Sequence, residues 1–189
     1  MSLSEGSTYS TYTTTNTTAA AGDGVKQGDN NGCRDPLAIE YGLSDKWGVG
    51  LNLGTDIYNV NPSSFYNFQT TTNNVKAFMS EFTLEANYHF FTADKIDLSG
   101  FVSLGLASVS INEKDGDAVN KYNAGGGIAR IGAKGRYYLT RRLGVLAILS
   151  AFSANCSTKG DTGNTVANNY STSIKGHALE FGLCYRILR

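Results

Sequence analysis

The stretch Phe78-Met-Ser-Glu-Phe-Thr-Leu-Glu-Ala-Asn-Tyr-His-Phe-Phe91 decides the fold, because apolar and polar side chains alternate along most of it. Successive side chains of a β-strand point to opposite faces, so a period of two predicts a strand with one apolar and one polar face. The ranges 37–43, 128–139 and 173–187 show the same alternation, and 96–111 and 143–156 show it less cleanly.

Four tyrosines, Tyr41, Tyr88, Tyr137 and Tyr185, mark a repeating unit of about 48 residues. A propeller blade of this length would need four strands, but each unit holds only two, so the repeat indicates an up-and-down meander. The connections alternate in length, with tight turns at 44–47, 92–95 and 140–143 and long loops at 61–77, 112–127 and 157–172.

Seven strands are well marked, and they are predicted at 37–43, 48–59, 78–91, 96–111, 128–139, 143–156 and 173–187. An eighth must precede a long loop at 17–36, and the only candidate is the weak stretch 7–15, whose apolar residues are Tyr9 and Tyr12. We therefore predict an all-β, up-and-down antiparallel transmembrane barrel of about eight strands. It forms a single domain over 1–189, with a weak first strand and a long loop in 1–36 and seven strands in 37–189.

Net charge and loop lengths limit the possible functions. The formal net charge is zero, whereas a nucleic-acid partner would require a basic surplus. Short turns on one side and long loops on the other are typical of bacterial outer-membrane barrels, whose short turns face the periplasm. Residues 1–6 lack the basic start and apolar core of a signal peptide. We therefore expect an outer-membrane protein whose signal peptide has been removed.

The polar faces carry charges that a bilayer would force inward. Each of Arg130, Lys134 and Arg136 would cost roughly 2–4 kcal/mol if it faced lipid near the midplane. In a barrel this narrow, side chains fill the lumen, and buried opposite charges should pair. The predicted lumen charge network contains Glu40, Glu81, Glu85, Arg130, Lys134, Arg136, Glu180 and Arg186. A gated path for small solutes through the same residues is the alternative.

The apolar faces predict contact with outer-membrane lipid and lipopolysaccharide. Aromatic residues beside the short turns suit a girdle at one membrane interface; they are Tyr41, Trp47, Tyr88, Tyr137 and Tyr185. Alternation alone leaves a second reading open, because a soluble lipocalin-like barrel has the inverse arrangement, with an apolar, ligand-binding lumen.

The ending Glu180-Phe-Gly-Leu-Cys-Tyr-Arg-Ile187 resembles the amphipathic last strand of the small eight-stranded outer-membrane barrels of the OmpA/OmpX type. The resemblance covers 37–189 and implies an architecture rather than an activity. Two features depart from that family, because Arg189 stands where an aromatic residue is usual and the first strand is weak. No peptidoglycan-binding domain follows, so that function of larger relatives is not implied.

Reactive side chains favour a non-enzymatic protein. A lipid A-modifying barrel would need a nucleophile and a base facing lipid, but Ser173 and His177 would lie ~13 Å apart along one strand. Lys175 occupies the position between them, and His89 should face the lumen. Neither a metal-binding motif nor a cofactor site is recognisable.

Cysteines and loop aromatics are the remaining candidates. Cys33 and Cys156 should both lie on the loop side, where they could form a disulfide or remain free thiols. Cys184 should face inward as a small packing residue. Phe65, Tyr66 and Phe68, among Asn and Thr, suit contact with a surface protein partner or packing over the barrel mouth.

Overall fold

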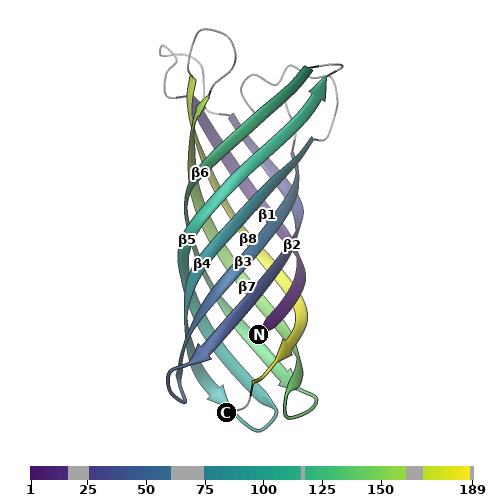
Figure 1. Cartoon of the computed structure of the whole chain (residues 1–189), viewed down its shortest axis with the longest axis vertical. Helices are drawn as coiled ribbons and strands as arrows, with labels where there is room; N and C mark the ends of the chain where they lie inside the picture. The colour runs from purple at the N-terminus through teal and green to yellow at the C-terminus, as the bar shows by residue number, and fades with distance from the viewer. Residues whose placement is uncertain (17–25, 61–74, 116–117, 161–167, 188–189) are drawn as a thin grey trace.

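The computed structural model describes residues 1–16, 26–60, 75–115, 118–160 and 168–187, and these form a closed antiparallel barrel of eight strands in chain order (Figure 1). The strands are β1 (Ser2–Asn16), β2 (Lys26–Gly42), β3 (Trp47–Val60), β4 (Val75–Thr92), β5 (Ile96–Asp115), β6 (Ala118–Tyr138), β7 (Leu143–Gly160) and β8 (Asn168–Tyr185). Pairing of β1 with β8 closes the ring, so no strand edge is left open. The predicted fold class is confirmed.

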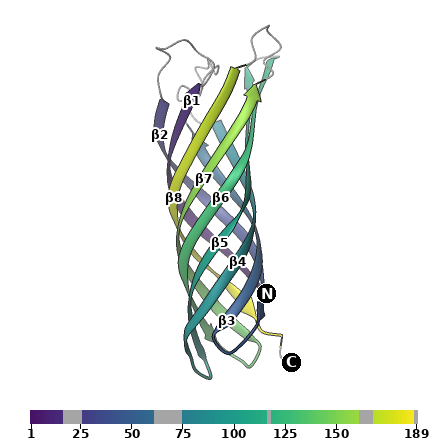
Figure 2. The same cartoon turned by 90° about the vertical axis from the view of Figure 1, so that its left-hand side faces the viewer.

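The three tight turns lie where the alternating pattern predicts them. Each is closed by backbone hydrogen bonds, such as Leu43 N–H to Trp47 O at 2.8 Å and Leu139 N–H to Leu143 O at 2.9 Å. In the β6–β7 turn, Thr140 Oγ1 also accepts from Leu143 N–H at 2.9 Å. Both chain termini lie at this turn side of the barrel (Figure 2). No helix in the described ranges is long and apolar enough to cross a membrane.

The long loops are shorter than predicted. The loop predicted at 17–36 is wrong in its second half, because β2 begins at Lys26, and only residues 116 and 117 separate β5 from β6. The first strand is likewise longer than 7–15. These segments are rich in Ser, Thr, Asn and Gly, which are typical of loops, but pairing with neighbouring strands extends the ladder through them.

The two halves of the barrel differ in polarity, and a smaller buried apolar cluster lies beside the charged residues inside the turn-side half: Phe101, Tyr138, Leu146, Ile148 and Cys184. In the turn-side half, the exposed outward side chains are mainly apolar and form what we call the apolar belt: Leu3, Ile39, Val49, Leu51, Leu53, Phe82, Leu84, Phe90, Leu98, Val102, Leu104, Leu106, Ile131, Val145, Leu149, Leu179, Phe181 and Leu183. In the loop-side half, a buried apolar cluster fills the interior: Tyr58, Ala77, Met79, Ala107, Val109, Ala124, Ile128, Phe152, Ala154, Cys156 and Ile174.

The outer surface of the loop-side half is polar, and its exposed residues include Asn31, Asn59, Ser108, Asn123, Asn155, Ser157, Ser171 and Lys175. An apolar belt around a polar interior is the membrane arrangement, whereas a polar surface around an apolar interior is the arrangement of a soluble barrel. The chain therefore changes from one arrangement to the other along the same strands, and the soluble alternative describes only the loop side.

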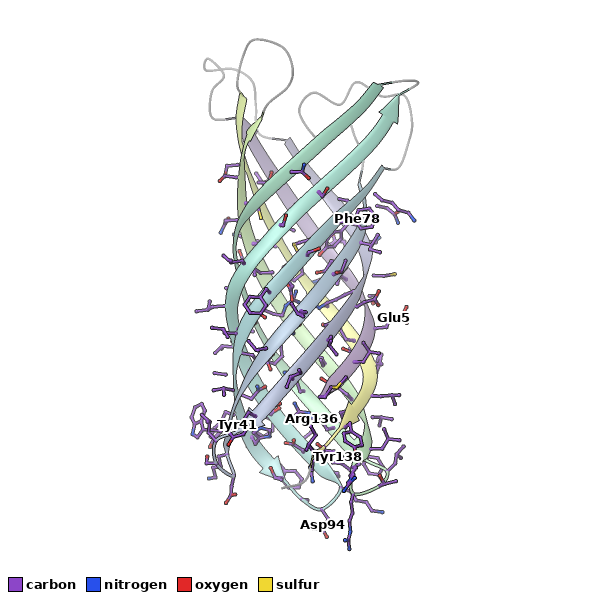
Figure 3. The ribbon with its side chains drawn as sticks, viewed as in Figure 1. Glu5, Tyr41, Phe78, Asp94, Arg136 and Tyr138 are labelled. Atoms are coloured by element: carbon purple, nitrogen blue, oxygen red, sulfur yellow. The ribbon has the colours of Figure 1, made fainter. Side chains whose placement is uncertain are left out.

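Two carboxylates interrupt the apolar belt on β1 and β2. Glu5 and Asp35 are both exposed on the outer surface, and the pairs Leu3–Leu37 and Gly6–Arg34 set them opposite each other. Glu5 lies near mid-height of the barrel, between Phe78 toward the loops and Tyr41 beside the turns (Figure 3). This sector of the lipid-facing wall therefore carries two adjacent exposed carboxylates.

Candidate functional site

The lumen of the turn-side half holds the charged side chains, in three groups that follow one another from mid-barrel to the short turns. They come from the inward faces of β2, β3, β4, β5, β6 and β8. Their ion pairs join six carboxylates to four Lys or Arg side chains and to His89. The network thus has two more carboxylates than Lys and Arg cations.

The first group is centred on Arg34 of β2, which is 1% exposed. Its Nη1 donates to Asp56 on β3 at 2.8 Å, its Nε donates to Glu180 on β8 at 2.9 Å, and its Nη2 donates to Glu81 on β4. Glu180 also accepts from the Ser4 hydroxyl on β1 at 3.1 Å. One guanidinium therefore ties together strands on both sides of the β1 closure.

Arg34 reaches across the lumen because the backbone beside it carries no side chains. Gly6 is the register partner of both Arg34 and Glu180. Gly54 lies beneath the guanidinium, and a Cβ there would come within 2.9 Å of both terminal nitrogens of Arg34. These two glycines make space for the three carboxylate contacts.

Arg130 of β6 extends the first group across the barrel. Its Nη2 donates to the second oxygen of Glu81 at 2.9 Å, and its Nη1 donates to Ser150 Oγ on β7 at 3.1 Å. The guanidinium also lies 4.6 Å from the centroid of the Phe152 ring, a cation–π contact at the boundary with the apolar cluster. Glu81 is thus shared by Arg34 and Arg130.

The second group is the ion pair between Lys134 of β6 and Glu85 of β4, both buried. Asn87 joins it, because its amide donates to Glu85 at 2.8 Å and its oxygen accepts from Lys134 Nζ at 3.2 Å. The ammonium also lies 4.5 Å from the centroid of the Phe101 ring. Lys134 Nζ and Glu85 Oε1 therefore have hydrogen-bond partners, which a buried pair requires, whereas Glu85 Oε2 is buried without one.

The third group is a closed ring of four side chains near the short turns. His89 Nε2 lies 2.8 Å from Glu40 Oε1, and His89 Nδ1 lies 2.7 Å from Asp97 Oδ1. Arg136 donates to the remaining oxygens of the same two carboxylates, at 2.9 Å for Asp97. The two imidazole nitrogens face acceptors, so a doubly protonated His89 satisfies both contacts. Arg136 lies at this end of the barrel in Figure 3.

Arg186 is a correction to the predicted network. It follows β8 at the barrel mouth, where strand pairing ends, and its guanidinium lies 3.7 Å from the centroid of the Tyr138 ring. The ion pairs of the described residues do not include it. The structure brings together the other seven predicted residues and adds Arg34, Asp56, Asp97 and His89.

A cavity of about 590 Å³, which we call the vestibule, opens the lumen at the turn side. It reaches inward past the Glu40–His89 ring to Glu85 and Lys134. Beyond that pair lie Arg34 and Arg130, which are almost fully buried, and then the apolar cluster. The lumen is thus open on one side and filled on the other.

The five predicted girdle residues are all exposed on the outer surface near the short turns or the end of β8: Tyr41, Trp47, Tyr88, Tyr137 and Tyr185. Trp47 and Tyr88 are register partners, and their ring centroids lie 4.9 Å apart. This placement suits an interface, where a ring keeps its apolar body in lipid and its polar atom in water.

Of the two states considered for Cys33 and Cys156, a disulfide or free thiols, the structure has free thiols. Cys33 lies on the exposed outer face of β2 rather than in a loop, whereas Cys156 faces the lumen of β7 and contacts Ala107 O at 3.9 Å. The two side chains point to opposite sides of the wall. Cys184 is buried as predicted.

His177 is exposed on β8, with its ring centroid 5.3 Å from that of Tyr9, and Ser173 lies toward the loops on the same strand. Phe65, Tyr66 and Phe68 lie outside the described residues. Among the described residues, no group of His, Cys, Asp and Glu side chains is arranged to hold a metal ion.

Several solved structures of outer-membrane proteins are similar to this chain. The outer-membrane protein OprG from Pseudomonas aeruginosa matches over 100% of this chain and 96% of its own, with 11% sequence identity and a TM-score of 0.51. Neisserial surface protein A matches over 94% of this chain and 95% of its own, with 13% identity and a TM-score of 0.45. The outer-membrane protease OmpT from Escherichia coli matches over 98% and 95%, with 12% identity and a TM-score of 0.46.

At these identities the similarity concerns the fold alone. No protein-family model and no curated protein matches the sequence. The fold is that of a small outer-membrane β-barrel, as the resemblance implied. The predicted location in the bacterial outer membrane follows from this fold and from the apolar belt, because a closed barrel satisfies every strand edge in lipid.

Proposed function

We propose that this chain is a non-enzymatic outer-membrane barrel whose wall is structural and whose loop-side half makes contacts at the cell surface. The observation that carries the proposal is the filled lumen. Arg34 joins β2 to β3, β4 and β8, and Arg130 joins β6 to β4 and β7. With the apolar cluster beyond them, these side chains leave the outer surface and the loops as the working parts.

Strand length supports a contact role for the loop side. About ten tilted residues suffice to cross the apolar part of a membrane, whereas β5 has 20 residues and β6 has 21. Their excess length would stand above the lipid, where the polar outer face meets water. The partners would be lipopolysaccharide or a surface protein.

The two histidines support a non-enzymatic role. Both ring nitrogens of His89 are engaged by Glu40 and Asp97, which stabilise a fixed imidazole rather than a general base. His177 lies against Tyr9, and Ser173 is four residues away along an extended strand. A lipid A-modifying reaction would need these last two groups much closer together.

A narrow pore is the second candidate, and the vestibule favours it. Its 590 Å³ opens the turn-side end of the lumen to water as far as Glu85 and Lys134. The network has six carboxylates against four Lys or Arg side chains, so such a pore would prefer cations.

Conductance across a planar bilayer distinguishes the two. The folded protein, shown to be inserted by its resistance to cold SDS, should give no discrete current steps in potassium chloride. Reproducible cation-selective steps would instead establish the pore. Arg130→Ala should then change their size, because that guanidinium stands between the vestibule and the apolar cluster.

The contact role has its own test. Deletion of residues 113–120 removes the end of the β5–β6 hairpin while keeping the register, since Asn112 pairs with Lys121. Cells that display the full chain should bind lipopolysaccharide-coated or host-cell surfaces better than cells that display the shortened chain. Equal binding, with equal surface levels, would contradict a contact role for this hairpin.

A further inference from the structure

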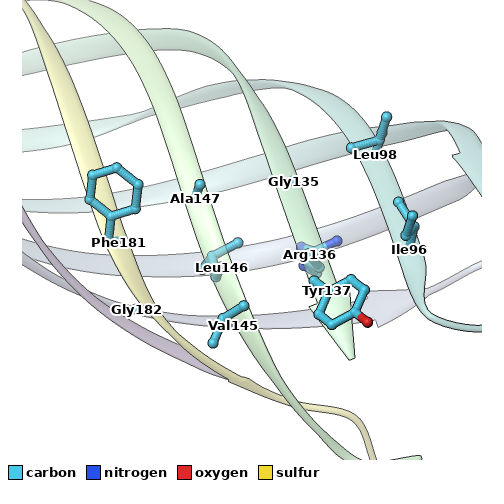
Figure 4. Close-up of a pocket in the computed structure, with 10 residues that line it drawn as sticks. All are labelled: Ile96, Leu98, Gly135, Arg136, Tyr137, Val145, Leu146, Ala147, Phe181 and Gly182. Carbon is cyan, nitrogen blue, oxygen red and sulfur yellow. The ribbon is translucent and has the colours of Figure 1, made fainter. Parts of the chain in front are cut away.

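A groove of about 580 Å³ lies in the lipid-facing wall near the short turns (Figure 4). Gly135 on β6 and Ala147 on β7 form its floor, and Leu98 on β5 and Phe181 on β8 stand on either side. The groove exists because two neighbouring outward positions carry small residues where most of the apolar belt carries Leu, Val or Phe. We call it the acyl groove.

Positive charge is concentrated beneath the acyl groove. The β2–β3 and β4–β5 turns each combine one Asp with one Lys, so their charges cancel. The β6–β7 turn instead contains Arg141 and Arg142 and no carboxylate. Both arginines are exposed. The turn directly connects β6 and β7, whose residues Tyr137 and Val145 line the turn-side end of the groove.

Contacts on the outer surface direct one of these cations toward the interface. Arg142 Nη1 lies 3.3 Å from the Tyr185 hydroxyl, and Tyr185 belongs to the aromatic girdle. The guanidinium is therefore held at the height where lipid headgroups meet water. An apolar groove that rises from a cationic rim matches a molecule with an acyl chain and an anionic head.

We propose that the acyl groove and the β6–β7 turn bind one anionic glycerophospholipid of the periplasmic leaflet. One acyl chain lies over Gly135 and Ala147, between Leu98 and Phe181. Arg141 and Arg142 hold the phosphate and the charged head, because guanidinium and phosphate form short charge-assisted hydrogen bonds. The side facing the periplasm follows from the short turns. The proposed lipid site depends on the membrane location of the barrel and is independent of the contact role proposed for its loop-side half.

Native mass spectrometry of the detergent-released barrel tests the proposal, with phosphatidylglycerol and phosphatidylcholine as probes. We expect one phosphatidylglycerol to be retained in preference to phosphatidylcholine. Ala147→Phe fills the groove, and Arg141→Gln with Arg142→Gln removes the rim charge. Each should lower phosphatidylglycerol retention about tenfold or more, the effect of losing a charge-assisted hydrogen bond or an equivalent apolar contact.

Matched controls use the same chemistry elsewhere. Ala151→Phe changes an exposed alanine of β7 four residues farther from the turn, and Lys46→Gln with Lys95→Gln removes cations from the other two turns. Both should retain phosphatidylglycerol as the wild type does. Resistance to cold SDS in every variant keeps a failure of the barrel distinct from a failure of the site.

Three results would overturn the proposal. Equal retention of phosphatidylglycerol and phosphatidylcholine would show that the charge of the lipid head does not contribute to binding. Loss in the arginine variant without loss in Ala147→Phe would reduce the effect to attraction by the turn alone. Replacement of the lipid adduct by a dimer that Ala147→Phe dissociates would assign the groove to a second copy of the chain.

Discussion

Arg34 and Glu180 are 146 residues apart in the chain, yet the Nε–H of Arg34 donates to Oε1 of Glu180 at 2.9 Å across the inner face of β1. The β1 residue between them is Gly6, which is in register with both. The ion pair therefore spans the seam where the first strand closes the barrel against the last. Closure of the ring and filling of the lumen depend on the same side chains.

Gly6→Ala should weaken this closure. A Cβ at Gly6 would lie 2.3 Å from Leu179 O and 2.7 Å from Glu180 Cγ, so strand or side chain must shift. Overpacking of this kind costs about 1–3 kcal/mol. Denaturant unfolding in lipid vesicles, followed by gel mobility, should show the loss. Gly125→Ala is the control, because a Cβ there has nothing within 4 Å, and equal losses in both variants would contradict the role of the seam.

Arg34→Met should destabilise the barrel by about 3–5 kcal/mol, because it leaves buried carboxylates without their cation. Adding Asp56→Asn and Glu180→Gln should recover much of the loss, since Glu81 then still pairs with Arg130. The same unfolding measurement applies. A triple variant no more stable than Arg34→Met would show that the loss comes from packing rather than from unpaired charge.

His89→Leu should cost about 1–2 kcal/mol, at the low end for charged hydrogen bonds because the vestibule admits water. It leaves Glu40 and Asp97 to share Arg136 alone. His177→Leu, on the outer face, should have a smaller effect. If the two substitutions change the free energy of unfolding equally, the ring around His89 contributes nothing specific.

Glu5→Leu and Asp35→Leu should each stabilise the barrel in lipid, by about 1 kcal/mol, because carboxylates facing lipid cost less than the roughly 2–4 kcal/mol of a cation but still disfavour insertion. Ser7→Leu, on the same outward face, adds apolar area without removing charge. If Ser7→Leu stabilises the barrel as much as Glu5→Leu does, the gain comes from added apolar area rather than from the lost charge. Destabilisation by Glu5→Leu would indicate that this wall faces something other than lipid.

Alternation was sufficient to predict the barrel, because outward and inward residues differ in chemistry wherever a strand crosses the membrane. Alternation failed to predict a strand where the outward and inward residues have similar chemistry. In β2, the run Asp29-Asn-Asn-Gly-Cys-Arg-Asp-Pro36 has the composition of a turn, and only pairing with β1 and β3 makes it a strand. Arg34 was therefore assigned to a loop and missed.

Within the strands that were predicted correctly, the alternation of side-chain direction was enough to predict the rest of the charge network. Glu81, Glu85, Arg130 and Lys134 face inward as predicted from their positions. Asp56 has the same parity as buried Asn52 and could have been found in the same way. Arg186 was misplaced because alternation tells whether a residue faces inward or outward but not how high it lies along the barrel. Where β8 ends is decided by its pairing with the neighbouring strands.

The most direct test of the two-half barrel is a nitroxide accessibility scan along the outer face in vesicles. In a Cys33→Ser, Cys156→Ala, Cys184→Ala background, Leu98→Cys, Leu104→Cys and Ser108→Cys place labels along β5. Labels at 98 and 104 should be more accessible to oxygen than to a water-soluble nickel chelate, and the label at 108 should show the reverse. Preference for nickel at all three positions would contradict a membrane-spanning turn-side half.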